Sequence, residues 1–246
     1  MMPLTRHGFR EMLIGSLVLV AVAVVLGYSI AWPISIIVLP VLIWLFAFFR
    51  DPDRTLPSEQ HAMVSPADGK VSDVTELPNY DLLGGPCVRI GIFLSVFNVH
   101  VNRAPCDGRV VKVIYKEGKF INAMKHDTAS SDNESNTIVL AEPKGERPIA
   151  VVKQIVGLIA RRIVSTAKEG DVVHRGDRIG MIKFGSRTEL YIPKSLEPQV
   201  KVKVGDTVRG AADVIALLGK PIHTESTEPA DVGEEFEPLV GRETPA

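Results

Sequence analysis

No charged side chain occurs between Met12 and Phe49, and this run limits what the chain can fold into more than any other feature. Residues 13–31 would rise roughly 28 Å as a helix, which matches the hydrocarbon core of a bilayer. Pro33 interrupts the run before a second, shorter apolar stretch, 34–49. A proline between two apolar stretches favours a helical hairpin or a bent, partly inserted pair. We therefore expect residues 1–54 to form an N-terminal hydrophobic helical membrane anchor.

Basic residues at both outer ends of this region predict its orientation. Arg6 and Arg10 precede the first apolar stretch, and Arg50 and Arg54 follow the second. The positive-inside rule then keeps both ends in the cytoplasm and places the following domain on the cytoplasmic face of the cell membrane. A cleaved secretory signal is the alternative, but the apolar region is longer than a signal core and has no small-x-small cleavage pattern.

After Arg54 the pattern changes to short β-branched runs separated by Gly, Pro and Asp, which is typical of an all-β barrel or sandwich. The best helix candidate is 119–126, and the polar stretch 125–136 indicates a surface loop. We expect a mainly β domain over residues 55–222. Its predicted strands are 70–74, 87–93, 109–115, 137–140, 149–156, 161–164, 179–184, 189–192 and 199–204.

Two internal echoes indicate a duplicated β unit. The segment 68–71 (Asp-Gly-Lys-Val) recurs at 107–110 as Asp-Gly-Arg-Val, and 170–176 (Gly-Asp-Val-Val-His-Arg-Gly) recurs at 205–210 as Gly-Asp-Thr-Val-Arg-Gly. Asp-Gly favours tight hairpin turns, and is common for that reason alone. Together the echoes resemble the turns of barrel-sandwich hybrid domains of the biotinyl and lipoyl type.

Charge and cysteine content limit the partners, metal sites and disulfides that we expect for this chain. The segment 223–246 holds seven acidic residues and one arginine, so we expect an acidic disordered tail. The rest of the chain is mildly basic, which suits an anionic membrane surface, and no nucleic acid partner is expected. Cys87 and Cys106 are the two cysteines. They have no metal-ligand spacing, which argues against a zinc site and a disulfide framework.

The pair Gly185-Ser186 follows the predicted strand 179–184 and carries the central hypothesis. Glycine has no side chain to shield its carbonyl, so the Ser186 hydroxyl could attack the Gly185 carbonyl and turn the amide into an ester. β-Elimination would then cut the chain and leave a pyruvoyl group, the cofactor, at the new N-terminus. Gly-Ser pairs are also ordinary turn chemistry, so the pair alone does not decide.

His100 and Asp68 are the residues that could assist Ser186. His100 ends a strongly apolar strand, where it would stay neutral at pH 7 as a general base must. Asp68 would hold the imidazole in the correct tautomer, as the acid does in serine-hydrolase triads. The same patterns would arise if His100 were a buried structural histidine and Asp68 were the first residue of a hairpin turn.

Four ordered motifs carry a family resemblance. They are Ser-Pro-Ala-Asp-Gly (65–69), Phe-Asn-Val-His-Val-Asn-Arg-Ala-Pro (97–105), Gln-Ile-Val-Gly-Leu-Ile-Ala-Arg-Arg-Ile (154–163) and Phe-Gly-Ser-Arg (184–187). With the N-terminal anchor, they resemble the short bacterial form of the phosphatidylserine decarboxylase family. The resemblance implies a self-cleaving proenzyme that converts phosphatidylserine to phosphatidylethanolamine and carbon dioxide through a Schiff base with its pyruvoyl group.

Position by position, the resemblance assigns the catalytic roles to Ser186, His100 and Asp68, and the cleavage site to Gly185 and Ser186. It implies a large β chain, 1–185, that stays bound to a small α chain, 186–246, with a membrane phospholipid as substrate. A higher homo-oligomer stays open. Longer bacterial relatives have Leu-Gly-Ser-Thr at the cleavage motif and His-Arg-Val-His where this chain has Phe-Asn-Val-His, so the His100 assignment rests on alignment through the shared valine.

The roles of four basic residues and two alternative functions stay open at this point. The basic residues that could pair with the phosphodiester, or could equally be exposed structural charges, are Lys153, Arg161, Arg162 and Arg187. A membrane-anchored serine hydrolase would use the same three catalytic residues without cutting itself, although Ser186 lacks the Gly-x-Ser-x-Gly elbow. A noncatalytic barrel-sandwich adaptor or carrier is the third alternative.

Overall fold

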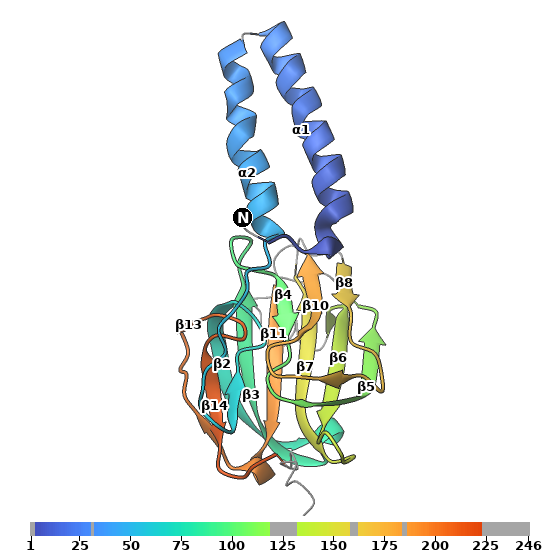
Figure 1. Cartoon of the computed structure of the whole chain (residues 1–246), viewed down its shortest axis with the longest axis vertical. Coiled ribbons are helices and arrows are strands. Elements are labelled where there is room, and N and C mark those ends of the chain that lie inside the picture. The colour runs from blue at the N-terminus through green and yellow to red at the C-terminus, as the bar shows by residue number, and fades with distance from the viewer. Residues whose placement is uncertain (1–2, 31, 119–131, 158–161, 184–185, 223–246) are drawn as a thin grey trace, which may run out of the picture.

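Two helices stand on one end of a β domain in the computed structural model (Figure 1). The structure describes residues 3–30, 32–118, 132–157, 162–183 and 186–222. The expected class, mainly β with an apolar helix at the N-terminus, is confirmed. The predicted helix 119–126, most of the predicted loop 125–136 and the acidic tail 223–246 lie outside the described residues.

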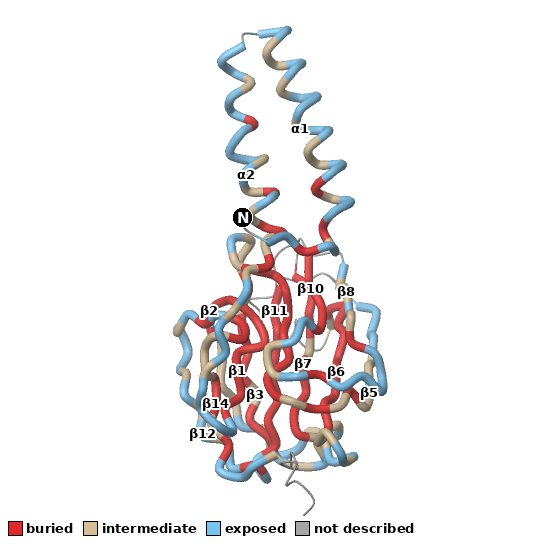
Figure 2. Tube along the Cα trace, in the orientation of Figure 1, coloured by how far each residue is buried: buried red, intermediate tan, exposed pale blue. Residues whose placement is uncertain are grey.

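The apolar region forms a helix pair. Its elements are η1 (Arg6–Gly8), α1 (Phe9–Ser29), η2 (Trp32–Val38) and α2 (Leu39–Phe48). Pro40 lies in the first turn of α2, where its missing N–H removes no helical hydrogen bond. Within the described chain, α1 is the one helix long and apolar enough to cross a membrane, and only 6% of its most apolar window is buried. Most side chains of the pair are exposed (Figure 2).

The β domain is built from short antiparallel strands. They are β1 (Ala62–Val64), β2 (Gly69–Tyr80), β3 (Gly85–Leu94), β4 (Val101–Arg103), β5 (Gly108–Lys116), β6 (Ser135–Ala141), β7 (Pro148–Val156), β8 (Arg162–Ser165), β9 (Val172–Val173), β10 (Arg178–Lys183), β11 (Ser186–Pro193), β12 (Pro198–Val200), β13 (Thr207–Val208) and β14 (Val214–Leu218). Two 3-10 turns, η3 (Asp81–Leu83) and η4 (Lys194–Leu196), connect them. Each predicted strand overlaps an observed one. Of the strands that the sequence analysis did not predict, β1, β4, β9 and β13 are too short to show an alternating pattern, whereas β14 is a short continuous apolar run that it missed.

The strands form three sheets that curl around one core. The largest has the order β13-β2-β3-β11-β7-β6-β5-β9, and the smaller ones are β1-β14-β12 and β4-β10-β8. Buried apolar side chains from β3 and β11, including Ile90, Ile92, Leu190 and Ile192, fill the space between them. The central strand, β11, is therefore hydrogen-bonded on both sides and buried along its whole length.

The internal echoes correspond to equivalent backbone geometry. Gly170 donates its N–H to the Val110 carbonyl, and Gly205 donates its N–H to the Val71 carbonyl, both at 2.8 Å. Asp68 accepts from the Gly210 N–H at 2.8 Å, and Asp107 accepts from the Arg175 N–H at 2.7 Å. The duplicated unit expected from the sequence is present, and its two aspartates hold equivalent turns.

The expectation for the end of the polar stretch 125–136 was wrong. Asn133, Glu134, Ser135 and Asn136 are buried, and the last two begin β6. Their polar side chains misled the prediction, because polarity indicated solvent. In the structure the Asn133 side chain donates to the Val156 carbonyl at 2.8 Å, which satisfies both groups inside the fold.

Arg187 and Glu189 form a buried ionic cluster on the face of β11 opposite Ser186. Arg187 is fully buried and bonds Glu189 at 2.9 Å, Ser72 at 2.5 Å and Asp73. These bonds join β11 to β2 across β3. Gly91 on β3 makes room for the cluster, since a Cβ there would lie 2.1 Å from Arg187 Nη2.

We expect Gly91→Ala to lower the free energy of unfolding by about 1–3 kcal/mol, because the added methyl group overpacks the ionic cluster. Gly85→Ala is the matched control on the same strand, since nothing lies within 4 Å of a Cβ at that position. Denaturant unfolding of the purified protein, followed by circular dichroism, measures both. Equal stability of the two variants would contradict the tight packing around Arg187.

Candidate active site

Ser186 is the first residue of β11 and lies at the end of the domain that carries the helix pair. Its backbone pairs with Leu94 of β3 on one side and Val156 of β7 on the other. The side chain is fully buried, and its Oγ has no hydrogen-bond partner among the described residues. A buried hydroxyl left without a partner destabilises the fold by about 1–3 kcal/mol, so it calls for an explanation. Gly185 lies outside the described residues.

His100 precedes β4, and its imidazole is also buried. Nδ1 lies 2.9 Å from the Asn98 carbonyl oxygen, while Nε2 is buried without a hydrogen-bond partner among the described residues. A carbonyl can only accept, so in the neutral ring Nδ1 carries the proton and Nε2 carries the lone pair. Burial lowers the pKa of His100 from 6.5 to about 4, and the ring is neutral at pH 7. This geometry leaves Nε2 free to accept a proton.

A buried hydrogen bond brings the strands that carry these two residues together. Asn102 Nδ2 donates to Thr188 Oγ1 at 2.9 Å. Side chains two residues apart on a strand share a face, and His100 and Ser186 each lie two residues before a member of this pair. The His100 carbonyl also accepts from the Ile182 N–H at 3.2 Å, at the end of β10 just before Ser186. His100 and Ser186 therefore lie at the same end of β4 and β11, although no hydrogen bond joins them.

Further buried amides extend this pair into a row. Gln154 donates to Asn102 at 2.9 Å, and Asn136 donates to Gln154 at 2.9 Å. The row runs from β6 through β7 and β4 to β11, and each amide orients the next. It fixes β4 against the main sheet, which places His100.

The last turn of α2 covers His100. The rings of Phe48 and His100 lie 4.3 Å apart between centroids, tilted by 35°. Phe48 is fully buried and packs in one apolar cluster with Met12, Leu45, Phe49 and Met181. The helix pair is therefore part of the wall that keeps water away from the imidazole.

Ion pairs fasten the helix pair to the domain at this end. Lys183, the last residue of β10, bonds Glu11 of α1 at 2.7 Å. Asp51, just after α2, accepts from Arg103 at 2.8 Å and from Arg178 at 2.5 Å. These bonds hold the covering helices in a defined position over the end of the domain where β10 ends and β11 begins.

Asp68 does not orient His100 in this structure, contrary to the prediction. Its carboxylate accepts from Arg54 at 2.7 Å and from the Gly210 N–H at 2.8 Å. Burial raises the pKa of Asp68, while the Gly210 N–H and Arg54 oppose that shift. The Asn98 carbonyl holds the imidazole instead.

The four basic candidates for the phosphodiester differ in location. Arg187 is fully buried in its ionic cluster, so it is neither an exposed charge nor a head-group contact. Lys153 is partly buried, and burial lowers its pKa. Arg162 is exposed on β8, opposite Lys183, at the helix end of the domain. Arg161 lies outside the described residues.

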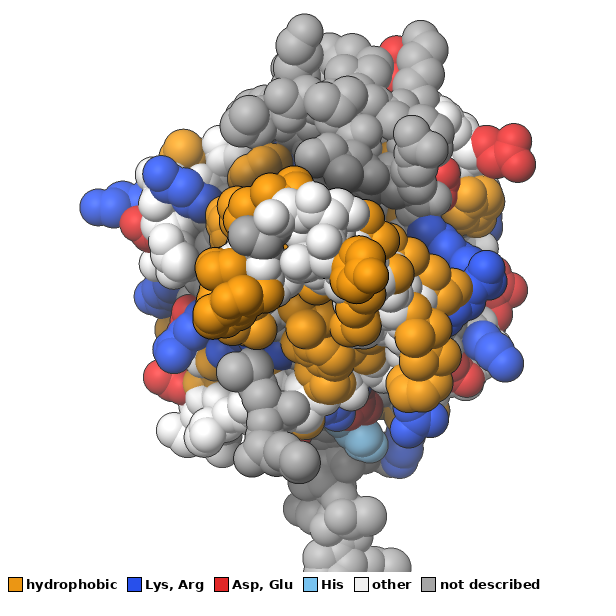
Figure 3. Space-filling view, turned by 90° about the horizontal axis from the view of Figure 1, so that it is seen from above, with side chains coloured by type: hydrophobic (Ala, Val, Ile, Leu, Met, Phe, Trp, Pro, Cys, Tyr) orange, Lys and Arg blue, Asp and Glu red, His pale blue; other side chains and the backbone are white. Residues whose placement is uncertain are grey.

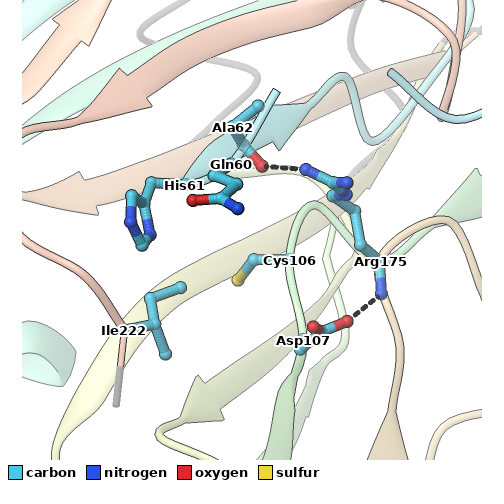
Figure 4. Close-up of a pocket in the computed structure, with 7 residues that line it drawn as sticks. All are labelled: Gln60, His61, Ala62, Cys106, Asp107, Arg175 and Ile222. Atoms are coloured by element: carbon cyan, nitrogen blue, oxygen red, sulfur yellow. Dashed lines mark hydrogen bonds between the residues drawn. The ribbon is translucent and has the colours of Figure 1, made fainter. Parts of the chain in front are cut away.

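A cavity of about 550 Å³ lies apart from these residues, lined by Gln60, His61, Ala62, Cys106, Asp107, Arg175 and Ile222 (Figure 4). Its polar groups serve the fold. Arg175 bonds the Ala62 carbonyl at 3.1 Å, and its backbone N–H bonds Asp107. Burial raises the pKa of Cys106 to about 12, which leaves an unreactive thiol. Both cysteines are free and buried.

Comparison with known proteins shows which family the chain is similar to. The family model described as phosphatidylserine decarboxylase matches residues 41–216. A phosphatidylserine decarboxylase proenzyme of Carboxydothermus hydrogenoformans is 47% identical over 82% of this chain and 92% of its own length. Proteins with the same name from Rhodopirellula baltica and Granulibacter bethesdensis are 42% and 46% identical, over 87% and 85% of this chain and 88% and 83% of their own lengths.

The chain belongs to the phosphatidylserine decarboxylase family. The matched residues include Phe48, Asp68, His100 and Ser186. The sequence analysis singled out Ser186 and His100, whose catalytic roles stay predictions, and it missed Asn98 and Phe48, which contact His100. A backbone carbonyl leaves no trace in the side-chain pattern, and Phe48 was hidden in a long apolar run that indicated lipid contact. The one sequence feature that could have pointed to Phe48 is its position close to Arg50, at the basic end of that run.

We expect Phe48→Ala to raise the pKa of His100 from about 4 toward its ordinary value of 6.5, because water reaches the imidazole once the ring is gone. The folded pKa lies below the unfolded one, so the neutral ring contributes stability above about pH 6.5 that is lost as the pH falls toward 4. Phe48→Ala should shrink this loss.

Histidine-selective NMR titration of the native chain and the variant measures the shift, with His100→Gln to assign the resonance. Phe49→Ala is the control, since Phe49 is equally buried and packs on Phe48. A His100 resonance that titrates at the same pH in the native chain and in Phe48→Ala would show that Phe48 does not shield the ring.

Proposed function

We propose that this chain is a pyruvoyl-dependent phosphatidylserine decarboxylase that makes its own cofactor by cutting the bond between Gly185 and Ser186. The observation that carries the proposal is a pair of buried atoms, Ser186 Oγ and His100 Nε2, neither of which has a hydrogen-bond partner in the part of the chain that the structure describes. One is a hydroxyl with a proton to give, and the other is a lone pair able to take it. Membership in the family, whose relatives are called proenzymes, supports the same conclusion.

The proposed cleavage begins when His100 Nε2 takes the Ser186 hydroxyl proton. Oγ attacks the Gly185 carbonyl, the C–N bond breaks, and the freed amine takes a proton, which leaves an ester on Oγ. Loss of the Ser186 α-proton then expels the Gly185 carboxylate. The resulting dehydroalanine rearranges and is hydrolysed with release of ammonia, so the small chain begins with a ketone. Burial supports the first step, because a neutral imidazole is a base at pH 7.

During turnover, the pyruvoyl ketone would supply the electron sink that loss of carbon dioxide from an amino acid requires. We assign to His100 one proton relay: Nε2 takes a proton from the substrate ammonium before carbon dioxide leaves and returns it to the substrate α-carbon afterwards. The Asn98 carbonyl fixes the ring for this step, and Phe48 keeps water from competing with it. The apolar surroundings also favour loss of the carboxylate charge, since that charge is poorly hydrated there.

We further propose that the helix pair attaches the enzyme to the cytoplasmic face of the membrane. Seen from the helix end, hydrophobic side chains gather over the helices, and basic and acidic side chains both lie at the rim (Figure 3). Arg6 and Arg10 are exposed at the base of α1. Attachment places Ser186 and His100, both at this end, close to the diacyl substrate, and leaves exposed Arg162 as the candidate for its phosphodiester.

Cutting at Gly185 would leave the large β chain and the small α chain joined. The small chain would contribute β11, which pairs with β3 and β7 of the large chain along its length. The serine hydrolase alternative uses the same residues without a cut. Its test is therefore whether the active protein is one chain or two.

We expect Ser186→Ala to stay one chain, form no pyruvoyl group and lose decarboxylase activity, because the nucleophile is gone. In the native protein, intact-mass spectrometry should give two fragments that meet between residues 185 and 186. The small one should be lighter by one ammonia than a chain beginning with serine. His100→Gln should accumulate uncut precursor. An uncut native chain with full activity would refute the proposal and favour a hydrolase-like mechanism.

We keep the catalytic assignment of Asp68 because this residue lies in the family motif at 65–69. Asp107, its counterpart in the repeated unit, provides a control. Asp68 and Asp107 accept equivalent backbone hydrogen bonds, but Asp107 lines the 550 Å³ cavity, whose lining includes neither Ser186 nor His100. We expect both Asp68→Asn and Asp107→Asn to lose about 1 kcal/mol from the weakened backbone bond, and Asp68→Asn to lose more because it also accepts from Arg54. Only Asp68→Asn should slow self-cleavage, as measured by the fraction of precursor over time. Equal cleavage rates would restrict Asp68 to its turn.

A further inference from the structure

The loop between β3 and β4, residues 95–99, lies at the helix end of the domain. It follows Leu94, which pairs with Ser186, and it leads into His100. In Figure 1 it is the green loop just below α2. Any membrane that receives the helix pair therefore faces this loop as well.

Hydrogen bonds hold the loop in a defined shape against α2. Trp44 Nε1 donates to the Val96 carbonyl at 3.3 Å, and Arg50 Nη2 donates to the Phe97 carbonyl at 2.7 Å. Within the loop, the Ser95 N–H and hydroxyl both donate to Asn98 Oδ1, at 2.9 and 2.8 Å. The side chain at its tip is thus presented by a rigid turn rather than by a free segment.

That side chain is Phe97, which is 71% exposed. Outside the helix pair it is the most exposed large apolar side chain among the described residues; the next, Val172 and Val204, are each 61% exposed. A single exposed apolar residue is ordinary on a protein surface. Here, however, it is fixed beside a tryptophan and an arginine, the residues that concentrate at the boundary between lipid and water.

We propose that the 95–99 loop is a second membrane contact, which inserts the Phe97 ring into the interfacial layer of a phospholipid bilayer. The proposal rests on the membrane attachment proposed above and deepens it. Asn98, the next residue, accepts from the His100 ring. The bilayer thus meets the protein three residues from the imidazole, so a lipid head group reaches the site along the loop without leaving the surface.

Spin labels at three positions test this, each on a single introduced cysteine in the full chain. The two natural cysteines are buried, at 0% and 3% exposure, so an exposed cysteine labels selectively. Phe97→Cys reports the loop. Val24→Cys, 64% exposed on α1, reports the helix pair. Val172→Cys is the matched control, because it pairs with Arg109 at the opposite end of the strands, where β6 ends at Ala141.

The labelled proteins are reconstituted in vesicles of phosphatidylethanolamine and phosphatidylglycerol, and collision with oxygen is compared with collision with a water-soluble nickel complex. We expect labels at 24 and 97 to favour oxygen and the label at 172 to favour the nickel complex. If the label at 24 favours oxygen while the label at 97 favours the nickel complex, as the label at 172 does, the loop proposal is overturned and the proposed membrane anchor stands. If 24 and 97 are both in water, the membrane attachment itself is wrong. A label at 172 that also favours oxygen would show that contact is not specific to the loop.

Discussion

The contact between Phe48 and His100 is the interaction on which the candidate site depends. It joins the last residue of α2 to the residue before β4, and both side chains are fully buried. Burial keeps the imidazole neutral, but it also removes hydration from a polar ring, a cost that the surrounding packing must offset. The apolar cluster around Phe48 supplies that packing. The helix pair is thus a wall of the site as well as a membrane anchor in the proposed function.

β11 serves two purposes because neighbouring residues on a strand face opposite sides. Ser186 and Thr188 face β4 and the buried amides, whereas Arg187 and Glu189 face the ionic cluster with Asp73. The cluster locks β11 against β2, and the Asn102–Thr188 bond locks it against β4. The serine is therefore held from both faces before any chemistry begins. Such fixed positioning is what an intramolecular attack on the adjacent carbonyl requires.

Local patterns predicted the strands and Ser186, but contacts between distant segments lay beyond them. Arg187 pairs with Asp73 across 114 positions, and nothing near either residue indicates the other. Asp68 shows the opposite difficulty. Its triad role followed from residue type, while the echo at Asp107 already indicated a repeated turn, and the structure has the turn. An internal repeat was thus better guidance to the geometry of Asp68 than the chemistry of its side chain.

The place of the proposed cut in the sheet explains why the fold could tolerate it. Ser186 is the first residue of β11, so all the described pairs of this strand would lie on the small-chain side of the broken bond. Pairing with β3 and β7 would persist on both sides, as would the buried ion pairs of Arg187. What the cut would remove is the tether that makes the end of β10 and the start of β11 one chain. In the proposed function the remaining pairs would hold β11 in place after the cut, so Ser186 and His100 would serve first maturation and then catalysis.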